Sequence, residues 1–207
     1  MPTTKEWAKS FGISTAATPP RIPDYDEPFP RSAREISERT IILQGVVARA
    51  FEVVNPKDVK DWFRSLNIWS SVTPCEQKFL RSTKPAKDQS QSFAWHVEAE
   101  WTLLWCIGKV DSLGLPTKTC DTKRLIDEII PALGSDIQEF IDTSKLREPG
   151  LLLAEDDRTY DLWCRAVKAR KNNSLPSDLN WSVLYERRYA FEWLDGNQEW
   201  DDVTCDS

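Results

Sequence analysis

Histidine and phosphate-binding glycine patterns are the clearest absences from this sequence. His96 is the only histidine, and the seven glycines form neither G-x-x-x-x-G-K nor G-x-G-x-x-G, nor is there a G-x-S-x-G elbow. Those patterns place backbone amides against phosphate, or a nucleophilic serine on a sharp turn. A single histidine also cannot build a multi-histidine zinc site. We therefore expect no cofactor and no bound metal, and enzymes of these types are excluded.

Paired cysteines and long apolar stretches are also missing. The cysteines are odd in number and have no C-x-x-C spacing: Cys75, Cys106, Cys120, Cys164 and Cys205. Such a set suits reduced thiols better than a disulfide framework. No apolar run approaches the ~20 residues that span a bilayer, and the first residues contain no apolar signal core. We expect a soluble, cytoplasmic protein that does not bind membranes.

The charge balance argues against nucleic acid as a partner. The chain has 27 Lys and Arg residues against 33 Asp and Glu residues, a net charge of -6 and a pI of about 5.0. Such a charge repels phosphate backbones. The 207 residues include ten tryptophans, which is enough for one domain with a substantial core.

Proline divides the chain into an arm and a body. Residues 15–31 contain five prolines, which cannot occupy a helix interior or a central strand. We expect residues 1–31 to form an extended N-terminal arm that lies on the body. Residues 32–207 would then form the folded domain.

The body has helical signals throughout. Ser32 to Glu35 and Thr73 to Glu76 are capping boxes, in which the two side chains satisfy orphan amides of the first turn. Further helices are expected to start at Asn55, Asp121, Ser135, about Gly150 and Asn180, and a central one covers residues 91–108. We predict an all-α, bundle-like single domain of about eight helices.

His96 lies in the predicted central helix. "His-Val-Glu" from His96 to Glu98 matches half of the zinc-deaminase pattern, but the required P-C-x-x-C half is absent. We therefore favour a polar residue at the edge of a helix face, near Glu100. Trp95, His96 and Glu98 are retained as candidate binding residues.

The C-terminal carboxylates have two interpretations. Asp201, Asp202 and Asp206 could bind a hard cation such as Mg²⁺, with Glu98 as a further ligand. Alternatively, they form a solvated tail or pair with the preceding arginines of the last helix, which would make the tail a structural latch. We favour the second interpretation because no phosphate cradle accompanies the carboxylates. The candidate binding residues in this region are Arg187, Arg188, Trp193, Trp200, Asp201, Asp202 and Asp206.

Several segments resemble a bacterial family called domain of unknown function 4272. The resemblance covers about residues 35–207 and is most specific in "LLW-x-x-G" with "PT" and in the closing "ER-x-YA-x-x-WL…WDDV-x-x-D". It implies a bacterial, cytosolic, helical protein and no established activity. Relatives often have W-R-x-E-A where this chain has His96, E-R-H-Y-A where it has Arg188, and L-H-W-A where it has Leu162 to Arg165. Loss of these histidines argues against an enzyme.

The function expected from the sequence is a non-catalytic protein-interaction module of the accessory or toxin-neutralising, immunity type. It would present an acidic face with Trp and Tyr anchors to a basic protein partner. One alternative is a metal-dependent hydrolase that uses the C-terminal carboxylates. Another is a binder of a small ligand between Trp95, Trp101 and Trp193.

Overall fold

The computed structural model describes residues 29–171 and 179–205, and this part of the chain contains eight α-helices and no strand. The predicted all-α class is therefore confirmed. The helices are α2 (Ala33–Ala50), α3 (Pro56–Ser65), α4 (Pro74–Arg81), α5 (Lys87–Cys106), α6 (Thr122–Arg124), α7 (Gln138–Asp142), α8 (Pro149–Lys171) and α9 (Trp181–Leu194). Short turns occur at η1 (Trp69–Ser71), the π-helical η2 (Leu125–Ile129) and η3 (Trp200–Asp202).

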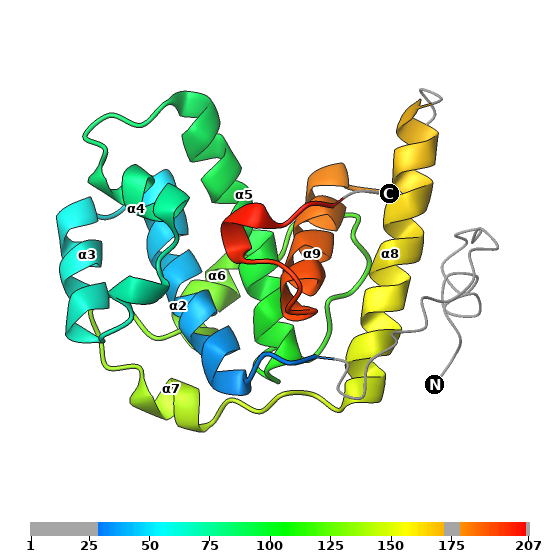
Figure 1. Cartoon of the computed structure of the whole chain (residues 1–207), viewed down its shortest axis with the longest axis horizontal. Coiled ribbons are helices and arrows are strands. Elements are labelled where there is room, and N and C mark those ends of the chain that lie inside the picture. Colours follow the sequence, from blue (N-terminus) through cyan, green and yellow to red (C-terminus); the bar gives the residue numbers. More distant parts are fainter. Residues whose placement is uncertain (1–28, 172–178, 206–207) are drawn as a thin grey trace.

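The long helices form a row with α5 near its centre (Figure 1). Helix α2 packs on one side of α5, α9 packs on the other side, and α8 packs against the outer side of α9. Helices α3 and α4 pack on each other and on α2, while α7 also contacts α2. The C-terminal turn η3 lies in front of α5 and α9 in this view.

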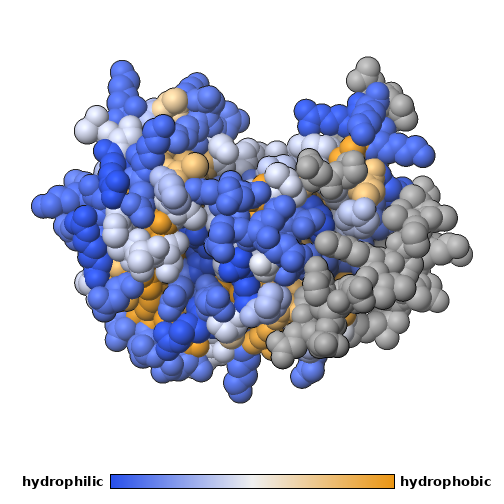
Figure 2. Space-filling view, viewed as in Figure 1, coloured by the Kyte–Doolittle hydropathy of each residue, from blue (hydrophilic) through white to orange (hydrophobic). Residues whose placement is uncertain are grey.

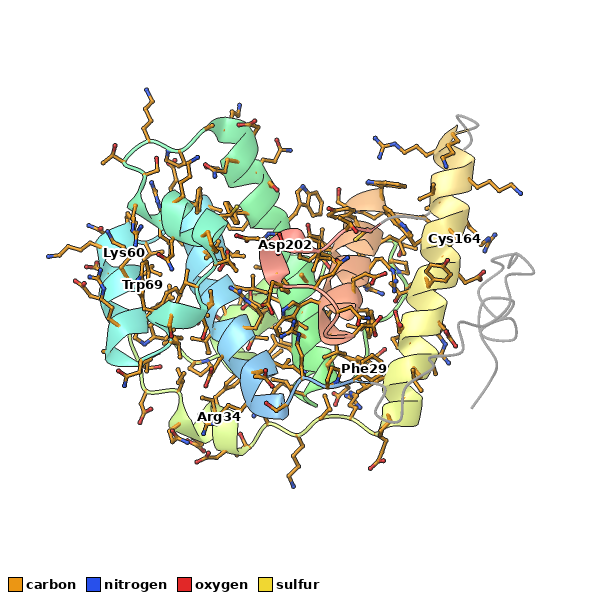
Figure 3. The ribbon with its side chains drawn as sticks, in the orientation of Figure 1. Phe29, Arg34, Lys60, Trp69, Cys164 and Asp202 are labelled. Carbon is orange, nitrogen blue, oxygen red and sulfur yellow. The ribbon has the colours of Figure 1, made fainter. Side chains whose placement is uncertain are left out.

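Helix α5, which contains most of the predicted central helix 91–108, is buried on several faces. Every residue from His96 to Cys106 is buried, because α2, α9 and the following loop all cover it. Side chains from α2, α5 and α9 fill the space between these helices (Figure 3). The outer surface is mostly hydrophilic in Figure 2, with small separate hydrophobic areas and a hollow between the α4–α5 end and α8.

Both predicted capping boxes are present. Ser32 Oγ accepts from the amide of Glu35, and Thr73 Oγ1 accepts from the amide of Glu76. Each glutamate carboxylate accepts in return from the amide of its cap residue. Asn180 caps α9, also as predicted, by accepting from two amides of its first turn.

Two helix boundaries differ from the prediction. The apolar residues spaced three and four apart from Ile36 to Val54 predict a helix up to Val54. Helix α2 ends at Ala50 instead, because Glu52 has a left-handed φ of 59° that closes the helix. Ser135 does not start a helix, because the amide of Gln138, which the Ser135 hydroxyl oxygen would have to accept from, donates to Oδ1 of Asp136 instead. Helix α7 starts only at Gln138.

Most of the predicted arm, residues 1–28, lies outside the described residues. The described end of the arm, from Phe29 to Arg31, contacts the body. Arg31 Nε donates to the carbonyl of Trp193 at 2.7 Å, and its guanidinium group lies 4.2 Å from the centre of that indole ring. Phe29 is buried.

In residues 29–171 and 179–205, none of the helices has both the length and the hydropathy needed to cross a bilayer.

Candidate functional site

A cleft of about 550 Å³ opens between α5, α8, α9 and the loop 112–121. Buried side chains form its inner wall, and the exposed residues of the loop form its rim. Its walls carry both apolar and ionisable groups, as small-molecule sites do. Its lining side chains include Trp101, Leu113, Lys118, Cys120, Asp121, Glu155, Arg158 and Arg187.

Arg187 of α9 holds the loop 112–121 against the helices. Its two terminal nitrogens donate to the carbonyls of Gly114 at 2.8 Å and Leu113 at 2.6 Å. The amide of Asn180 donates to the carbonyl of Pro116 at 2.7 Å and fixes the middle of the loop. The rim of the cleft is therefore positioned before any ligand arrives.

Glu98 of α5 fixes the far end of the same loop. Its Oε1 accepts from the amide of Cys120 at 2.7 Å, while Oε2 is buried without a hydrogen-bond partner. Burial raises the pKa of Glu98, although the Cys120 amide and the nearby charge of Arg187 lower it. The structure thus brings Glu98, which lies behind the cleft wall, close to Arg187, although the two residues are far apart in sequence.

Arg187 carries a buried charge. It is 5 % exposed, and in the described parts of the chain no carboxylate oxygen lies within 4.0 Å of its nitrogens. Burial lowers its pKa, while the charges of Glu155 and Glu98 raise it. A guanidinium group stays protonated in proteins, so Arg187 contributes an incompletely balanced positive charge to the wall.

Helix α8 adds a second arginine to the cleft. Arg158 pairs with Glu155 one turn away, with 2.9 Å between its Nη1 and the carboxylate Oε2. Among the neighbouring charges, that of Glu155 raises the pKa of Arg187 the most. Two arginines therefore share one neighbouring carboxylate on this side of the cleft.

Glu100 is a second buried carboxyl on α5. It is 0 % exposed, neither oxygen has a hydrogen-bond partner, and burial raises its pKa well above the ordinary value. Because the pKa of Glu100 is higher in the folded state, its protonated form stabilises the folded protein. This contribution is fully present below the unfolded-state pKa of about 4.3 and is lost as pH rises toward the folded-state pKa.

Glu100→Gln removes this titration. Above pH 5, the free energy of unfolding of the wild type falls relative to that of the variant. We expect the difference between the two to change in favour of the variant by about 1.4 kcal/mol for each pH unit. Urea unfolding at several pH values measures the difference. The exposed Glu139→Gln is the control, and a difference that stays constant with pH would contradict a neutral Glu100.

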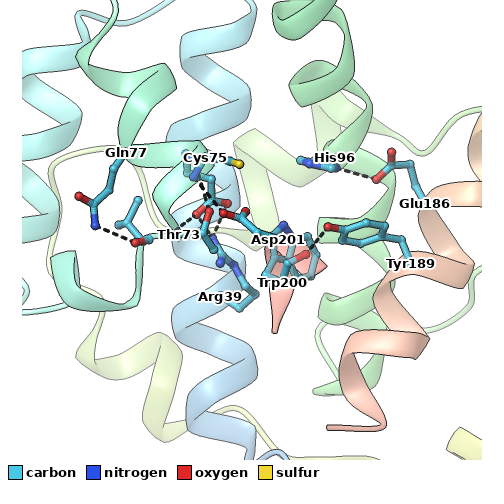
Figure 4. Close-up of polar contacts among 11 residues, drawn as sticks. Arg39, Thr73, Cys75, Gln77, His96, Glu186, Tyr189, Trp200 and Asp201 are labelled. Carbon is cyan, nitrogen blue, oxygen red and sulfur yellow. Dashed lines mark hydrogen bonds and ion pairs between the residues drawn. The ribbon is translucent and has the colours of Figure 1, made fainter. Parts of the chain in front are cut away.

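His96 lies away from this cleft, in a cluster under the C-terminal turn (Figure 4). Its Nδ1 is 2.8 Å from Oε2 of Glu186 on α9. Phe93, Tyr189 and Trp200 pack around the imidazole, with ring centres 5.6 to 5.8 Å away. The residue is buried, so the prediction of a helix-edge position near Glu100 is wrong.

The C-terminal turn is attached to the body, but the predicted arginine pairing is wrong. Asp201 Oδ2 accepts from the amide of Cys75 at 2.9 Å, which satisfies an orphan donor in the first turn of α4. Trp200 is 2 % exposed, and its carbonyl accepts from the hydroxyl of Tyr189. Arg187 binds the loop 112–121 instead of the tail.

Arg188 also faces away from the tail. Its Nη1 is 2.7 Å from Oδ1 of Asp156 on α8, and its Nη2 pairs with Glu192 one turn along α9. The guanidinium carbon lies 5.0 Å from the centre of the Tyr160 ring. Arg188 therefore ties α9 to α8, which explains why a nearly fully buried arginine is tolerated.

The remaining predicted residues do not form a common site. Trp95 is half-buried and Trp193 is buried under Arg31, so neither lines the cleft with Trp101. Asp202 is exposed on η3 (Figure 3), and Asp206 lies outside the described residues. The described residues contain no group of three His, Cys, Asp or Glu side chains that could hold a metal ion.

The sequence reasoning missed most of the cleft wall. Glu155, Arg158 and the loop 112–121 were not singled out. One available signal was the presence of Glu98 and Glu100 in an otherwise apolar segment, since carboxyl groups are almost never fully buried without a partner or a role.

Comparison with known proteins identifies a family. No curated protein and no solved structure matches the chain. A family model described as "Domain of unknown function (DUF4272)" matches residues 2–203. Because this match spans nearly the whole chain, the protein belongs to the DUF4272 family, which the sequence resemblance had indicated.

Proposed function

We propose that this protein is a non-catalytic binding protein that holds a small anionic molecule in the cleft between α5, α8, α9 and the loop 112–121. The observation that carries the proposal is the charge of Arg187, which is only 5 % exposed at the cleft wall and has no carboxylate within 4.0 Å among the described residues. Buried charges are normally paired. A ligand carboxylate or phosphate would supply the missing counter-charge.

The hydrogen-bonding capacity of Arg187 supports this ligand class. Each of its two terminal nitrogens carries two hydrogens, and the structure uses one bond from each, to Leu113 and Gly114. Arg158 lies on the α8 wall, and the exposed Lys118 lies on the rim. Guanidinium groups bind carboxylates and phosphates with directional, charge-assisted hydrogen bonds.

The acidic groups of the cleft are already engaged. Glu155 pairs with Arg158, and Asp121 accepts from the amide of Arg124 at the start of α6. Among the described lining residues, three cations, Lys118, Arg158 and Arg187, accompany these two acids. The cleft is therefore less acidic than the chain as a whole, which carries a net charge of -6.

The size and apolar walls of the cleft indicate a compact organic molecule. Its volume of about 550 Å³ falls within the range of roughly 300–1,000 Å³ that is typical of small-molecule sites. Trp101 and Leu113 provide apolar contact. The ligand that fits best has one acidic group and a small apolar body.

A non-catalytic role agrees with the chemistry of the wall. Cys120 is the one thiol among the lining side chains, and burial followed by the charge of Glu98 raises its pKa. A protonated thiol is a poor nucleophile. His96 belongs to a separate cluster and does not line the cleft.

The expected interaction with a basic protein partner stays a prediction. The residues proposed for its acidic face are mostly occupied within the fold, because Trp200 is buried and Asp201 caps α4.

Probes of matched shape and different charge test the proposal. We expect benzoate or phenyl phosphate to raise the Tm and benzylamine and benzamide not to do so, because ligands that bind only the folded state stabilise it. Titration calorimetry then gives the affinity. Arg187→Met should weaken binding of the anion by about tenfold or more.

Three further variants separate a lost ligand contact from a damaged fold. Arg187→Lys keeps the charge and should bind better than Arg187→Met. Lys118→Met alters only the exposed rim and should weaken binding a few-fold, while Lys145→Met, outside the cleft, should leave it unchanged. Equal Tm shifts with benzoate and benzylamine, or no shift with any anion, would disprove the proposal.

A further inference from the structure

The turn that ends α2 has a strained backbone. The amide of Glu52 donates to the carbonyl of Arg49 and the amide of Val53 donates to that of Ala48, which closes the helix. Glu52 itself has a φ of 59°, in the left-handed region that favours glycine. A side chain in this conformation costs stability, so the turn is not optimised for folding alone.

The same turn exposes two large apolar side chains. Phe51 is 55 % exposed and Val53 is 75 % exposed. Helix-ending turns of this kind usually pack the residue after the left-handed position back onto the helix. Val53 instead leaves most of its surface exposed to solvent. Strain and apolar exposure at one position are features of functional surfaces.

A shallow groove of about 830 Å³ runs from this turn to the connection between α4 and α5. Among the residues that the structure describes, its ionisable lining consists of three cations, Arg49, Lys84 and Lys87, and one acid, Glu52. Both lysines are exposed, and Nε of Arg49 is buried without a hydrogen-bond partner. The groove is therefore locally positive on a chain with a net charge of -6.

We propose that this groove docks an acidic segment of a partner protein. Apolar side chains of the segment would contact Phe51 in the groove and Val53 next to it, and its carboxylates would pair with Lys84 and Lys87. An apolar centre with a charged rim is the usual composition of a protein interface, and complementary charge selects the partner. The site is separate from the small-molecule cleft and does not depend on it.

Charge complementarity favours this occupant over two others. A second copy of the chain would bring the same positive groove against itself, which like charges oppose. Two exposed lysines are also fewer than the cluster of four to eight basic residues that typically recruits a chain to anionic lipid.

Peptide selection on the immobilised full chain tests the proposal and does not require the partner to be identified first. The probe is a random peptide library displayed on phage, and enriched peptides are then synthesised and measured by fluorescence anisotropy. We expect enriched sequences to combine Asp or Glu with Leu, Ile or aromatic residues. Their affinity should fall as salt rises, because exposed charges are screened.

Variants then locate the site. The double variant Phe51→Ser, Val53→Ser should lose about tenfold or more in affinity, and Lys84→Glu with Lys87→Glu should do the same. The matched control is Ile126→Ser with Leu133→Ser, which alters the other exposed large apolar side chains of the described residues. Glu52→Gly should raise the Tm by about 2–4 °C because it relieves the strained backbone.

Several outcomes would overturn the proposal. These are enrichment of basic or purely apolar peptides, no enrichment, or unchanged affinity in the Phe51 and Val53 variant. Binding to phosphatidylserine vesicles that the same variant abolishes would instead indicate a membrane surface. Dimerisation in sedimentation experiments that this variant abolishes would indicate a second copy.

Discussion

Glu76→Ala is expected to lower the free energy of unfolding by about 3–5 kcal/mol, because it leaves a buried arginine without its counter-charge. Nη2 of Arg39 lies 2.6 and 2.7 Å from the two carboxylate oxygens of Glu76. Arg39 is 4 % exposed and Glu76 is 0 % exposed, so water cannot replace the lost partner. The guanidinium group also lies 4.9 Å from the centre of the Trp200 ring, so we expect the C-terminal turn to loosen.

Glu35→Ala is the matched control for this prediction. Glu35 has the same capping-box role on α2 but is exposed and makes no buried ion pair, so its loss should cost only about 1 kcal/mol. Replacing both partners, Arg39→Met with Glu76→Leu, should recover most of the lost stability. Urea unfolding measures all three variants. Equal losses for Glu35→Ala and Glu76→Ala would show that only the cap matters.

The sequence predicted the helices well because their start signals are local. Both capping boxes join residues three apart, and Asn180 bonds to amides two and three residues later. A local signal fails where a competing local bond exists, as at Ser135, because the amide of Gln138 donates to the carboxylate of Asp136 instead of to the Ser135 hydroxyl. The early end of α2 at a left-handed Glu52 had no such signal, because glycine is the residue that usually marks this position.

The candidate site could be predicted only in part, because its contacts span long stretches of sequence. Glu98 and Arg187 were both predicted as candidate residues, but the sequence did not show that they lie close together. Arg187 reaches this position through a bond to the carbonyl of Leu113, which is 74 residues earlier in the chain. The arginines near the C-terminus were expected to pair with the nearest aspartates. Asp156 of α8 pairs with Arg188 instead, and no periodicity within a single helix reports such a partner.

Gly45→Ala is expected to lower the free energy of unfolding by about 1–3 kcal/mol, although alanine is the better helix former. Gly45 lies within α2 where α3 crosses it. A Cβ atom added there would lie 2.5 Å from Cζ of Phe63 and 2.7 Å from Cγ1 of Val59. Both neighbours are core side chains, with exposures of 0 % and 2 %, so neither can move without disturbing the packing.

Gly150→Ala is expected to have the opposite effect on the free energy of unfolding, and urea unfolding measures both variants. Gly150 lies in the first turn of α8, and an added Cβ atom would meet nothing within 4 Å. This substitution should therefore stabilise the protein by about 0.4–1 kcal/mol, since it reduces the entropy of the unfolded chain. Adding Phe63→Leu to Gly45→Ala should recover part of the loss only if the clash with the ring causes it. A Gly45→Ala variant as stable as Gly150→Ala would mean that α2 and α3 can separate at no cost.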